Sequence, residues 1–137
     1  MKIKLLQKIQ KPCKSHLPDV GLDIFMPEAF DIEPLETKTI GLKICVSIPE
    51  GYAGMLVPRS SIAAKGLLIQ TSIIDPDYTG EIHLIITNCS NSSQHVDVGQ
   101  RVCSLVMLNA LNANLEFDDD NNVRTSRGTN GLGSSGK

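Results

Sequence analysis

Alternation of hydrophobic and polar residues is the clearest pattern in the chain, and it predicts β-strands. From 40 to 48 every second residue is Ile, Leu or Val, the period of a strand with one buried face. Pro49-Glu50-Gly51 then predicts a turn, and 52–57 a returning strand. We expect further short strands at Ile3 and Leu5, 20–25, 96–98, 102–108 and 115–117.

The spacing of these segments leaves little room for helix. One helical turn is expected at 62–65, with Ser60 or Ser61 as its N-cap and Gly66 as its end. About eight short strands joined by turns are typical of an all-β sandwich or jelly roll. The run at 102–108 is apolar on both faces, which predicts burial on both sides, in a sandwich core or at a subunit interface.

The amino-acid composition narrows the class of protein further. At 137 residues the chain has the size of one domain, and with no Trp and 4% aromatic residues its core must consist of Ile, Leu and Val. A formal charge of −2 argues against a basic nucleic-acid surface. No segment has the hydrophobic length of a signal peptide or a membrane span, and the four cysteines form no C-x-x-C pair, so we expect a soluble intracellular protein (cytoplasm or nucleus) with reduced thiols.

Two apolar runs, 67–74 and 82–86, flank an acidic turn and predict a β-hairpin. Asp75 lies at the start of the turn and Tyr78 follows three residues later, so a water-activating base and a flat ring meet at one hairpin mouth. For an Asp-Pro-Asp sequence in isolation, a merely solvated turn is the simpler interpretation.

Three other segments carry candidate chemistry. Asp23 interrupts an apolar strand, which is usually the mark of a turn or cap residue. Arg59-Ser60-Ser61 opens the predicted helical turn, a weak signal for a phosphate seat. The glycine-rich segment after Arg127 fits either a disordered tail or a mobile arm whose N–H groups wrap phosphate oxygens. Spacing does not choose between these alternatives.

Taken together and in order, five segments resemble the trimeric deoxyuridine triphosphate nucleotidohydrolase (dUTPase) family. They cover most of the chain: Val20-Gly21-Leu22-Asp23-Ile24, Pro58-Arg59-Ser60-Ser61, Ile74-Asp75-Pro76-Asp77-Tyr78-Thr79-Gly80, Gly99-Gln100-Arg101-Val102 and Arg127-Gly128-Thr129-Asn130-Gly131-Leu132-Gly133-Ser134-Ser135-Gly136. The resemblance implies a distorted jelly-roll homotrimer whose three active sites are shared between subunits. It implies a β domain at 1–117, followed at 118–137 by a linker and a mobile arm that closes the site.

The resemblance also implies hydrolysis of dUTP to dUMP and pyrophosphate, with Mg²⁺ on the triphosphate. Asp75 would be the base that activates water, and Asp23 would hold the Mg²⁺ through a water molecule. Tyr78 would pack against the deoxyribose and exclude a 2′-hydroxyl. The residues implied to bind the substrate are Arg59, Ser60, Ser61, Ser72, Ile73, Tyr78, Gln100, Arg127, Leu132, Gly133, Ser134 and Ser135.

Three residues depart from the family pattern, and they motivate an alternative. Leu132 stands where the arm usually has Phe, while Ser61 and Ser72 replace glycines. A chain with these changes fits a dUTPase-derived binding or regulatory module without catalysis, whereas a dCTP deaminase relative is less favoured because Tyr78 and the arm occur together. No nucleic-acid or membrane partner is expected.

Overall fold

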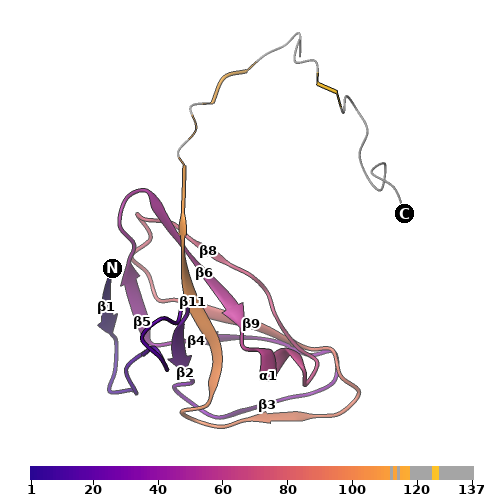
Figure 1. The fold of residues 1–137 in the computed structure, drawn as a ribbon. Coiled ribbons are helices and arrows are strands. Elements are labelled where there is room, and N and C mark those ends of the chain that lie inside the picture. Colours follow the sequence, from indigo (N-terminus) through magenta and orange to yellow (C-terminus); the bar gives the residue numbers. More distant parts are fainter. Residues whose placement is uncertain (112, 114, 118–124, 127–137) are drawn as a thin grey trace.

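The computed structural model describes residues 1–111, 113, 115–117 and 125–126, and within them nearly all of the regular secondary structure is β-strand (Figure 1). The elements are β1 (Lys2–Leu5), β2 (Leu22–Phe25), β3 (Phe30–Ile32), β4 (Thr37–Gly41), β5 (Ile44–Ser47), β6 (Tyr52–Pro58), α1 (Ser60–Ala63), β7 (Leu67–Ile69), β8 (Ile73–Ile74), β9 (His83–Asn88), β10 (Gln94–Val96) and β11 (Arg101–Asn109). The predicted all-β fold is confirmed. With four residues, α1 is far shorter than the ~20 that a membrane-spanning helix requires, and no other helix occurs in the described residues.

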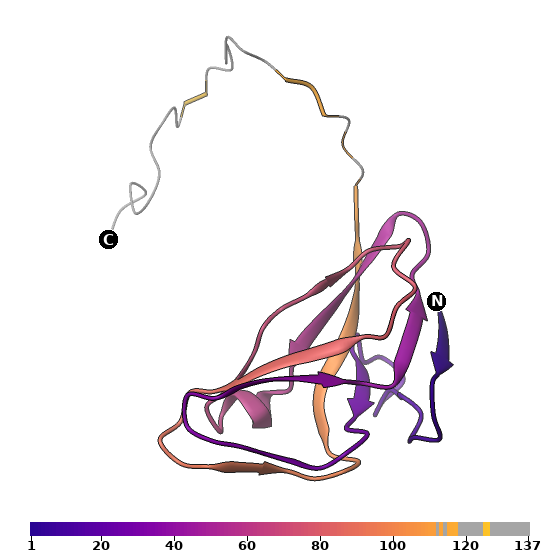
Figure 2. The ribbon, with the colours of Figure 1, turned by 180° about the vertical axis from the view of Figure 1, so that it is seen from behind.

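The strands form four small antiparallel sheets in the described part of the chain. The largest has the order β2-β11-β6-β8, a second has the order β4-β9-β7, and the pairs β1-β5 and β10-β3 complete the set. Figures 1 and 2 show β1 and β5 at one end of the body and α1 at the opposite end. The core between the sheets is built mainly from Ile, Leu and Val, as the composition predicted.

The long strand predicted at 40–48 is in fact two strands that belong to different sheets. β4 pairs with β9 and β5 pairs with β1, and the chain turns between them at Lys43, whose φ of +58° is left-handed. The alternation of buried residues nevertheless continues through the corner, because Leu42 and Ile44 both bond the backbone of Ile82. Periodicity therefore predicted the buried face correctly and missed the corner.

The hairpin predicted around Asp75 is open in its middle. β7 and β9 pair near its base, where Ile69 is opposite Ile86, but Ile73 and Ile74 of β8 pair with β6 instead. The two arms of the hairpin thus join different sheets beyond the base. This separation leaves a space between the arms.

The burial predicted on both sides of 102–108 is confirmed only for the first half of β11. This strand lies between β2 and β6 in the largest sheet, and Val102, Cys103 and Leu105 are buried, but Leu108 is 36% exposed. The strand predicted at 115–117 is wrong, because these residues have no regular structure and Phe117 is 94% exposed. The cysteines are free, as predicted. The predicted boundary after residue 117 stays a prediction, since 118–124 and 127–137 lie outside the described residues.

Candidate active site

The open hairpin forms a cleft with a volume of about 220 Å³. Its walls come from both arms of the hairpin and from β6: Leu56, Ser72, Ile73, Ile74, Asp75, Tyr78, Glu81, Ile82, His83 and Ile85. The cleft exists because β8 pairs with β6 and not with β9, so within the described residues β9 has a strand on both sides only at Ile86 and Thr87. Three predicted site residues, Ser72, Ile73 and Tyr78, therefore meet Asp75 in one place.

Asp75 and Tyr78 belong to the turn at the mouth of this cleft. The turn is closed by a bond of 3.2 Å from the Tyr78 N–H to the Asp75 carbonyl, and both side chains are exposed. The carboxylate of Asp75 has no hydrogen-bond or ion-pair partner within the described part of the chain. An exposed carboxylate at the edge of a largely apolar cleft is able to accept a proton from a bound water.

The ring of Tyr78 is held against the backbone of its own turn. Its hydroxyl donates to the Glu81 carbonyl at 2.8 Å, and the ring passes over Gly80 so closely that a Cβ there would be 2.5 Å from the hydroxyl oxygen. Glu81 in turn fixes the turn to the β4–β5 corner. Its carboxylate accepts the Lys43 N–H at 2.9 Å and lies 3.3 Å from the Lys43 ammonium. The glycine therefore sets where the ring lies.

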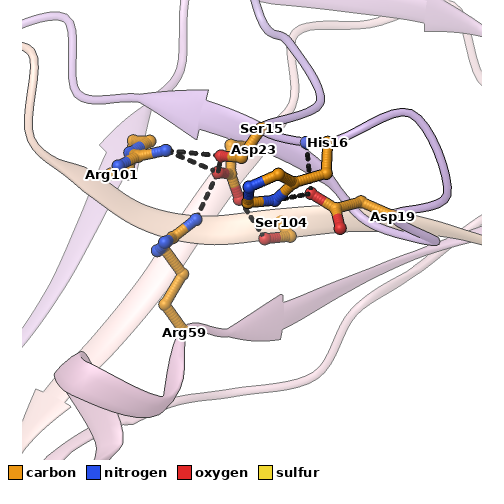
Figure 3. Close-up of polar contacts among 7 residues, drawn as sticks. All are labelled: Ser15, His16, Asp19, Asp23, Arg59, Arg101 and Ser104. Atoms are coloured by element: carbon orange, nitrogen blue, oxygen red, sulfur yellow. Dashed lines mark hydrogen bonds and ion pairs between the residues drawn. The ribbon is translucent and has the colours of Figure 1, made fainter.

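A second, more polar cleft of about 790 Å³ surrounds Asp23. Figure 3 shows Arg59 and Arg101 converging on the Asp23 carboxylate, with Ser15 and Ser104 beside it. Oδ2 accepts from Ser15 at 3.0 Å and from Arg101 Nη1 at 3.2 Å, and it forms an ion pair with Arg59 Nη1. Oδ1 accepts from Ser104 at 2.8 Å.

Strand register places these groups side by side. Asp23 of β2 is opposite Ser104 of β11, and Arg59 follows the end of β6, the strand on the other side of β11. The Arg59 N–H also donates to the Val102 carbonyl at 3.1 Å, which ties it to the residue after Arg101. Two backbone bonds between Cys13 and Asp23 bring the loop with Ser15 to the same place.

The pKa of Asp23 lies below its usual range. Burial of the carboxyl group raises the pKa, but the hydrogen bonds from Ser104, Arg59 and Ser15 and the charge of Arg59 together lower it by more. The carboxylate is thus ionised at neutral pH although only 6% of the residue is exposed. It acts as a fixed negative charge that two arginines share.

The remaining predicted site residues take different positions. Ser60 and Ser61 are exposed in α1, but the N-cap of this helix is Arg59, with no side-chain cap bond, so the predicted serine cap is wrong. The Gln100 side chain accepts the Asp97 N–H within its own turn and does not line the Asp23 cleft. Arg127, Leu132, Gly133, Ser134 and Ser135 lie outside the described residues. Sequence reasoning missed Arg101, Ser15 and Ser104.

The two clefts lie far apart in a single chain. Ile74 is opposite Gly54 near the start of β6, so Asp75 lies level with Ala53, whereas Arg59 comes after the end of that strand. At ~3.3 Å per residue, the six positions from Ala53 to Arg59 span roughly 20 Å. Figure 1 shows β8 beside β6, and α1 after the end of β6. One chain alone does not bring Asp75 and Arg59 to the same phosphate.

The described residues do not supply a metal centre of their own. No three His, Cys, Asp or Glu side chains among them gather in an arrangement that would bind a metal ion. Asp23 does not fit as a direct ligand either, since four donors already occupy its two oxygens. Any water-mediated contact of Asp23 with Mg²⁺ stays a prediction.

Comparison with known proteins agrees with this architecture. The family model described as dUTPase matches residues 7–136. A deoxyuridine 5′-triphosphate nucleotidohydrolase of Leifsonia xyli subsp. xyli is 36% identical over 129 residues, 91% of this chain and 84% of that protein. A Pol polyprotein of equine infectious anemia virus is 35% identical over 118 residues, which are 86% of this chain and only 10% of the polyprotein.

A solved structure of a Staphylococcus bacteriophage 80alpha dUTPase variant with dUpNHpp has a TM-score of 0.92 at 30% identity, covering 99% of this chain and 98% of that one. Fold and clefts thus define a nucleotide hydrolase that is nearly all β. The chain belongs to the dUTPase family, as the five segments in the sequence predicted. Enzymes of this family use a divalent metal ion in binding the triphosphate.

Proposed function

We propose that this chain hydrolyses dUTP to dUMP and pyrophosphate with Asp75 as the general base. Asp75 takes a proton from a water molecule whose oxygen attacks the α-phosphorus in line. The bond between the α-phosphorus and the α–β bridging oxygen breaks, and that oxygen leaves with pyrophosphate. The observation that carries this assignment is the Asp75 carboxylate at the mouth of the open hairpin cleft, which has no partner among the residues that the structure describes.

The hairpin cleft is the proposed site of the deoxyuridine. Uracil carries adjacent donors and acceptors on one edge, and the separated arms at Ser72 and Ile73 expose backbone that is able to pair with such an edge. The Tyr78 ring, fixed over Gly80, supplies a flat surface for the deoxyribose. A ribose has an additional 2′-hydroxyl on this side, so the same ring excludes UTP.

The phosphate chain lies in the Asp23 cleft of a neighbouring subunit in this proposal. Arg59 donates to the phosphate oxygens, and Ser60 and Ser61, exposed at the start of α1, line the approach. The separation of roughly 20 Å between Asp75 and Arg59 in one chain supports a shared site, because only a second subunit brings an arginine cleft to the hairpin. A homotrimer with three such sites meets this requirement.

Magnesium enters this scheme as part of the substrate. A triphosphate chelates Mg²⁺ through its own oxygens, and the ion keeps several waters, so no protein cage is needed. Arg127, Leu132, Gly133, Ser134 and Ser135 are proposed to cover the bound nucleotide, with Arg127 on the γ-phosphate. We further propose that Gln100 lies near the phosphate end of the site.

The test of this function is pyrophosphate release from dUTP, dCTP, dTTP and UTP, each with and without Mg²⁺. We expect release from dUTP only, and strong stimulation by Mg²⁺. Ammonia release from dCTP would instead indicate a deaminase. Equal release from dUTP and UTP would contradict the role of Tyr78.

A regulatory role is a second candidate function. The bacteriophage 80alpha dUTPases, to which this chain is 30% identical with a TM-score of 0.92, are described as controlling transfer of virulence genes by a proto-oncogenic G protein-like mechanism. The departures from the family pattern at Ser61, Ser72 and Leu132 fit a chain that is used for regulation and not for catalysis. Binding of dUpNHpp with no cleavage of any nucleotide in the panel would favour this candidate over the enzyme.

A further inference from the structure

We propose that Arg101 is a second phosphate-binding arginine of the site, and that Asp23 serves as the positioning residue that holds Arg59 and Arg101 next to each other. The inference rests on the proposed function, since it assumes that the Asp23 cleft receives the triphosphate of dUTP. Arg101 was not among the substrate-binding residues expected from the sequence.

The two arginines reach the cleft from different strands and share one anchor. Arg101 begins β11 and Arg59 follows β6, yet the Nη1 atoms of both contact Oδ2 of Asp23. A second contact fixes Arg101, since its Nη1 also donates to the Ser15 hydroxyl at 2.6 Å. Figure 3 shows the guanidinium groups approaching the carboxylate from separate directions. Their placement is therefore built into the fold.

Both guanidinium groups keep donors for a ligand. In the described part of the chain only Nη1 of each arginine contacts Asp23 or Ser15, and a guanidinium carries five N–H donors. The side chains are 30% exposed for Arg59 and 41% for Arg101, and both line the same cleft. Planar N–H pairs match phosphate oxygens in geometry as well as in charge.

Charge balance in the cleft points to an anion. Lys14, Arg59 and Arg101 line it together with Asp19 and Asp23, which gives three positive and two negative groups, a net charge of +1 with His16 neutral. One carboxylate does not neutralise two guanidinium groups. The cleft therefore has positive charge left over to attract a polyanion. Because Asp23 already holds the two arginine side chains in place, they lose less conformational entropy when a ligand binds.

The contacts of the Asp23 carboxylate indicate that it positions the two arginines. Four donors occupy its two oxygens, which a carboxylate that coordinates a metal ion would have to release. Asp23 is also 6% exposed, so removing its charge would leave two arginines without their common partner. The carboxylate thus acts on the substrate through the arginines.

The test compares Arg101→Gln, Arg101→Lys, Arg59→Gln and Asp23→Asn with wild type by calorimetric titration with dUpNHpp and Mg²⁺. We expect Arg101→Gln to weaken dUpNHpp binding about 10- to 100-fold, the value of a charge-assisted bond. Arg101→Lys keeps the charge but lacks the planar guanidinium, so we expect its affinity for dUpNHpp to lie between those of wild type and Arg101→Gln. Lys38→Gln, in the β4-β9-β7 sheet, is the matched control for loss of a partly exposed cation that also pairs with a carboxylate.

A phosphate-free ligand separates binding from structural damage. Inhibition by deoxyuridine is expected to change less than about twofold in Arg101→Gln, because deoxyuridine has no phosphate group for Arg101 to contact. An equal loss of deoxyuridine and dUpNHpp affinity would overturn the inference. If Arg101→Gln does not fold, the same comparison is made with Arg101→Lys, for which unchanged dUpNHpp affinity would be the contradicting result.

The Mg²⁺ dependence of turnover tests the role of Asp23. We expect Asp23→Asn to raise KM for dUTP while the half-activating Mg²⁺ concentration stays within about twofold, and the effects of Asp23→Asn and Arg101→Gln to be non-additive. A tenfold or greater rise in that concentration with unchanged KM would instead make Asp23 a metal-holding residue. Wild type that neither binds dUpNHpp nor cleaves dUTP would overturn the proposed function, whereas unchanged binding in Arg101→Gln alone overturns only this inference.

Discussion

At the scale of single residues, Asp75 is separated from the arginines that dominate the electrostatics of the other cleft. Its carboxylate has no partner in the described part of the chain, and it belongs to a turn that backbone bonds hold in place. Replacing it by an isosteric amide removes the base and leaves the cleft intact. Its contribution is therefore separable from folding.

We predict that Asp75→Asn lowers kcat for dUTP by ~100-fold or more, the usual share of a general base. Binding of dUpNHpp is expected to stay within a few-fold, because the amide keeps the shape of the turn. Pyrophosphate release gives kcat and calorimetry gives the affinity. Asp77→Asn, two positions along the same turn, is the matched control, and near-normal turnover in Asp75→Asn would remove Asp75 from the mechanism.

Gly80 allows a second test at this scale. A Cβ there would be 2.5 Å from the Tyr78 hydroxyl oxygen and 2.7 Å from Cζ, so Gly80→Ala must displace the ring. Because the ring is half-exposed, we expect little loss of stability but an increase in KM for dUTP of about tenfold, equivalent to ~1.4 kcal/mol. The preference for dUTP over UTP should fall as well.

The control for Gly80→Ala is Tyr78→Phe, which loses only the bond to the Glu81 carbonyl and keeps the ring. Steady-state kinetics with dUTP and UTP measure the preference in both variants. An unchanged preference in Gly80→Ala would show that the position of the ring does not decide between the two sugars.

At the scale of elements, local patterns predicted strands, and long-range pairing decided how they are used. The alternation from 40 to 48 was correct about burial, but the corner at Lys43 depends on β4 and β5 finding different partners, β9 and β1. The open hairpin likewise depends on β8 pairing with β6. No local signal distinguishes a closed hairpin from an open one.

The contacts in the Asp23 cleft also depend on long-range strand pairing, which local sequence patterns do not predict. The sequence predicted both Asp23 and Arg59 as site residues, but Asp23 as a holder of Mg²⁺ and Arg59 as a binder of substrate, with no contact between them. Arg101 lies 78 positions from Asp23 in sequence, and only the antiparallel register of β2 and β11 brings them together. Asp75 and Tyr78, by contrast, are three residues apart and share a turn, so the sequence alone predicted that they would meet.

The β3–β10 pair carries a pH-sensitive contact. His95 lies between Asp31 at 2.6 Å and Asp97 at 3.2 Å, and the hydrogen bond with Asp31 is the main reason that the pKa of His95 is raised. A raised pKa in the folded state means that the contact stabilises fully below the unfolded value of about 6.5. This contribution is lost as pH rises through the higher folded pKa.

We therefore predict that wild type loses stability relative to His95→Gln as pH increases from about 6 to 9. Urea midpoints measured at several pH values test this, and the comparison cancels the titration of the other histidines. The difference should shrink at high salt, because the imidazole and its carboxylates are exposed. A difference between the two proteins that does not change with pH would rule out the contact as its source.

At the scale of the whole molecule, the distance between the clefts makes assembly part of the chemistry. Asp75 and Arg59 lie at opposite ends of β6, so in the proposed trimer a complete site takes its hairpin from one subunit and its arginine cleft from another. Two inactive variants then damage different halves of the site. Mixed in one trimer, they restore some sites from their intact halves.

We predict that co-expressed Asp75→Asn and Arg59→Gln chains recover activity that neither variant has alone. A site works when its hairpin comes from an Arg59→Gln chain and its cleft from an Asp75→Asn chain, and every mixed trimer, whether 2:1 or 1:2, has one such site, about a third of its sites. Pyrophosphate release from trimers purified through two different tags measures this. Activity no higher than that of the separate variants would mean that both groups act within one chain, contrary to the roughly 20 Å that β6 places between them.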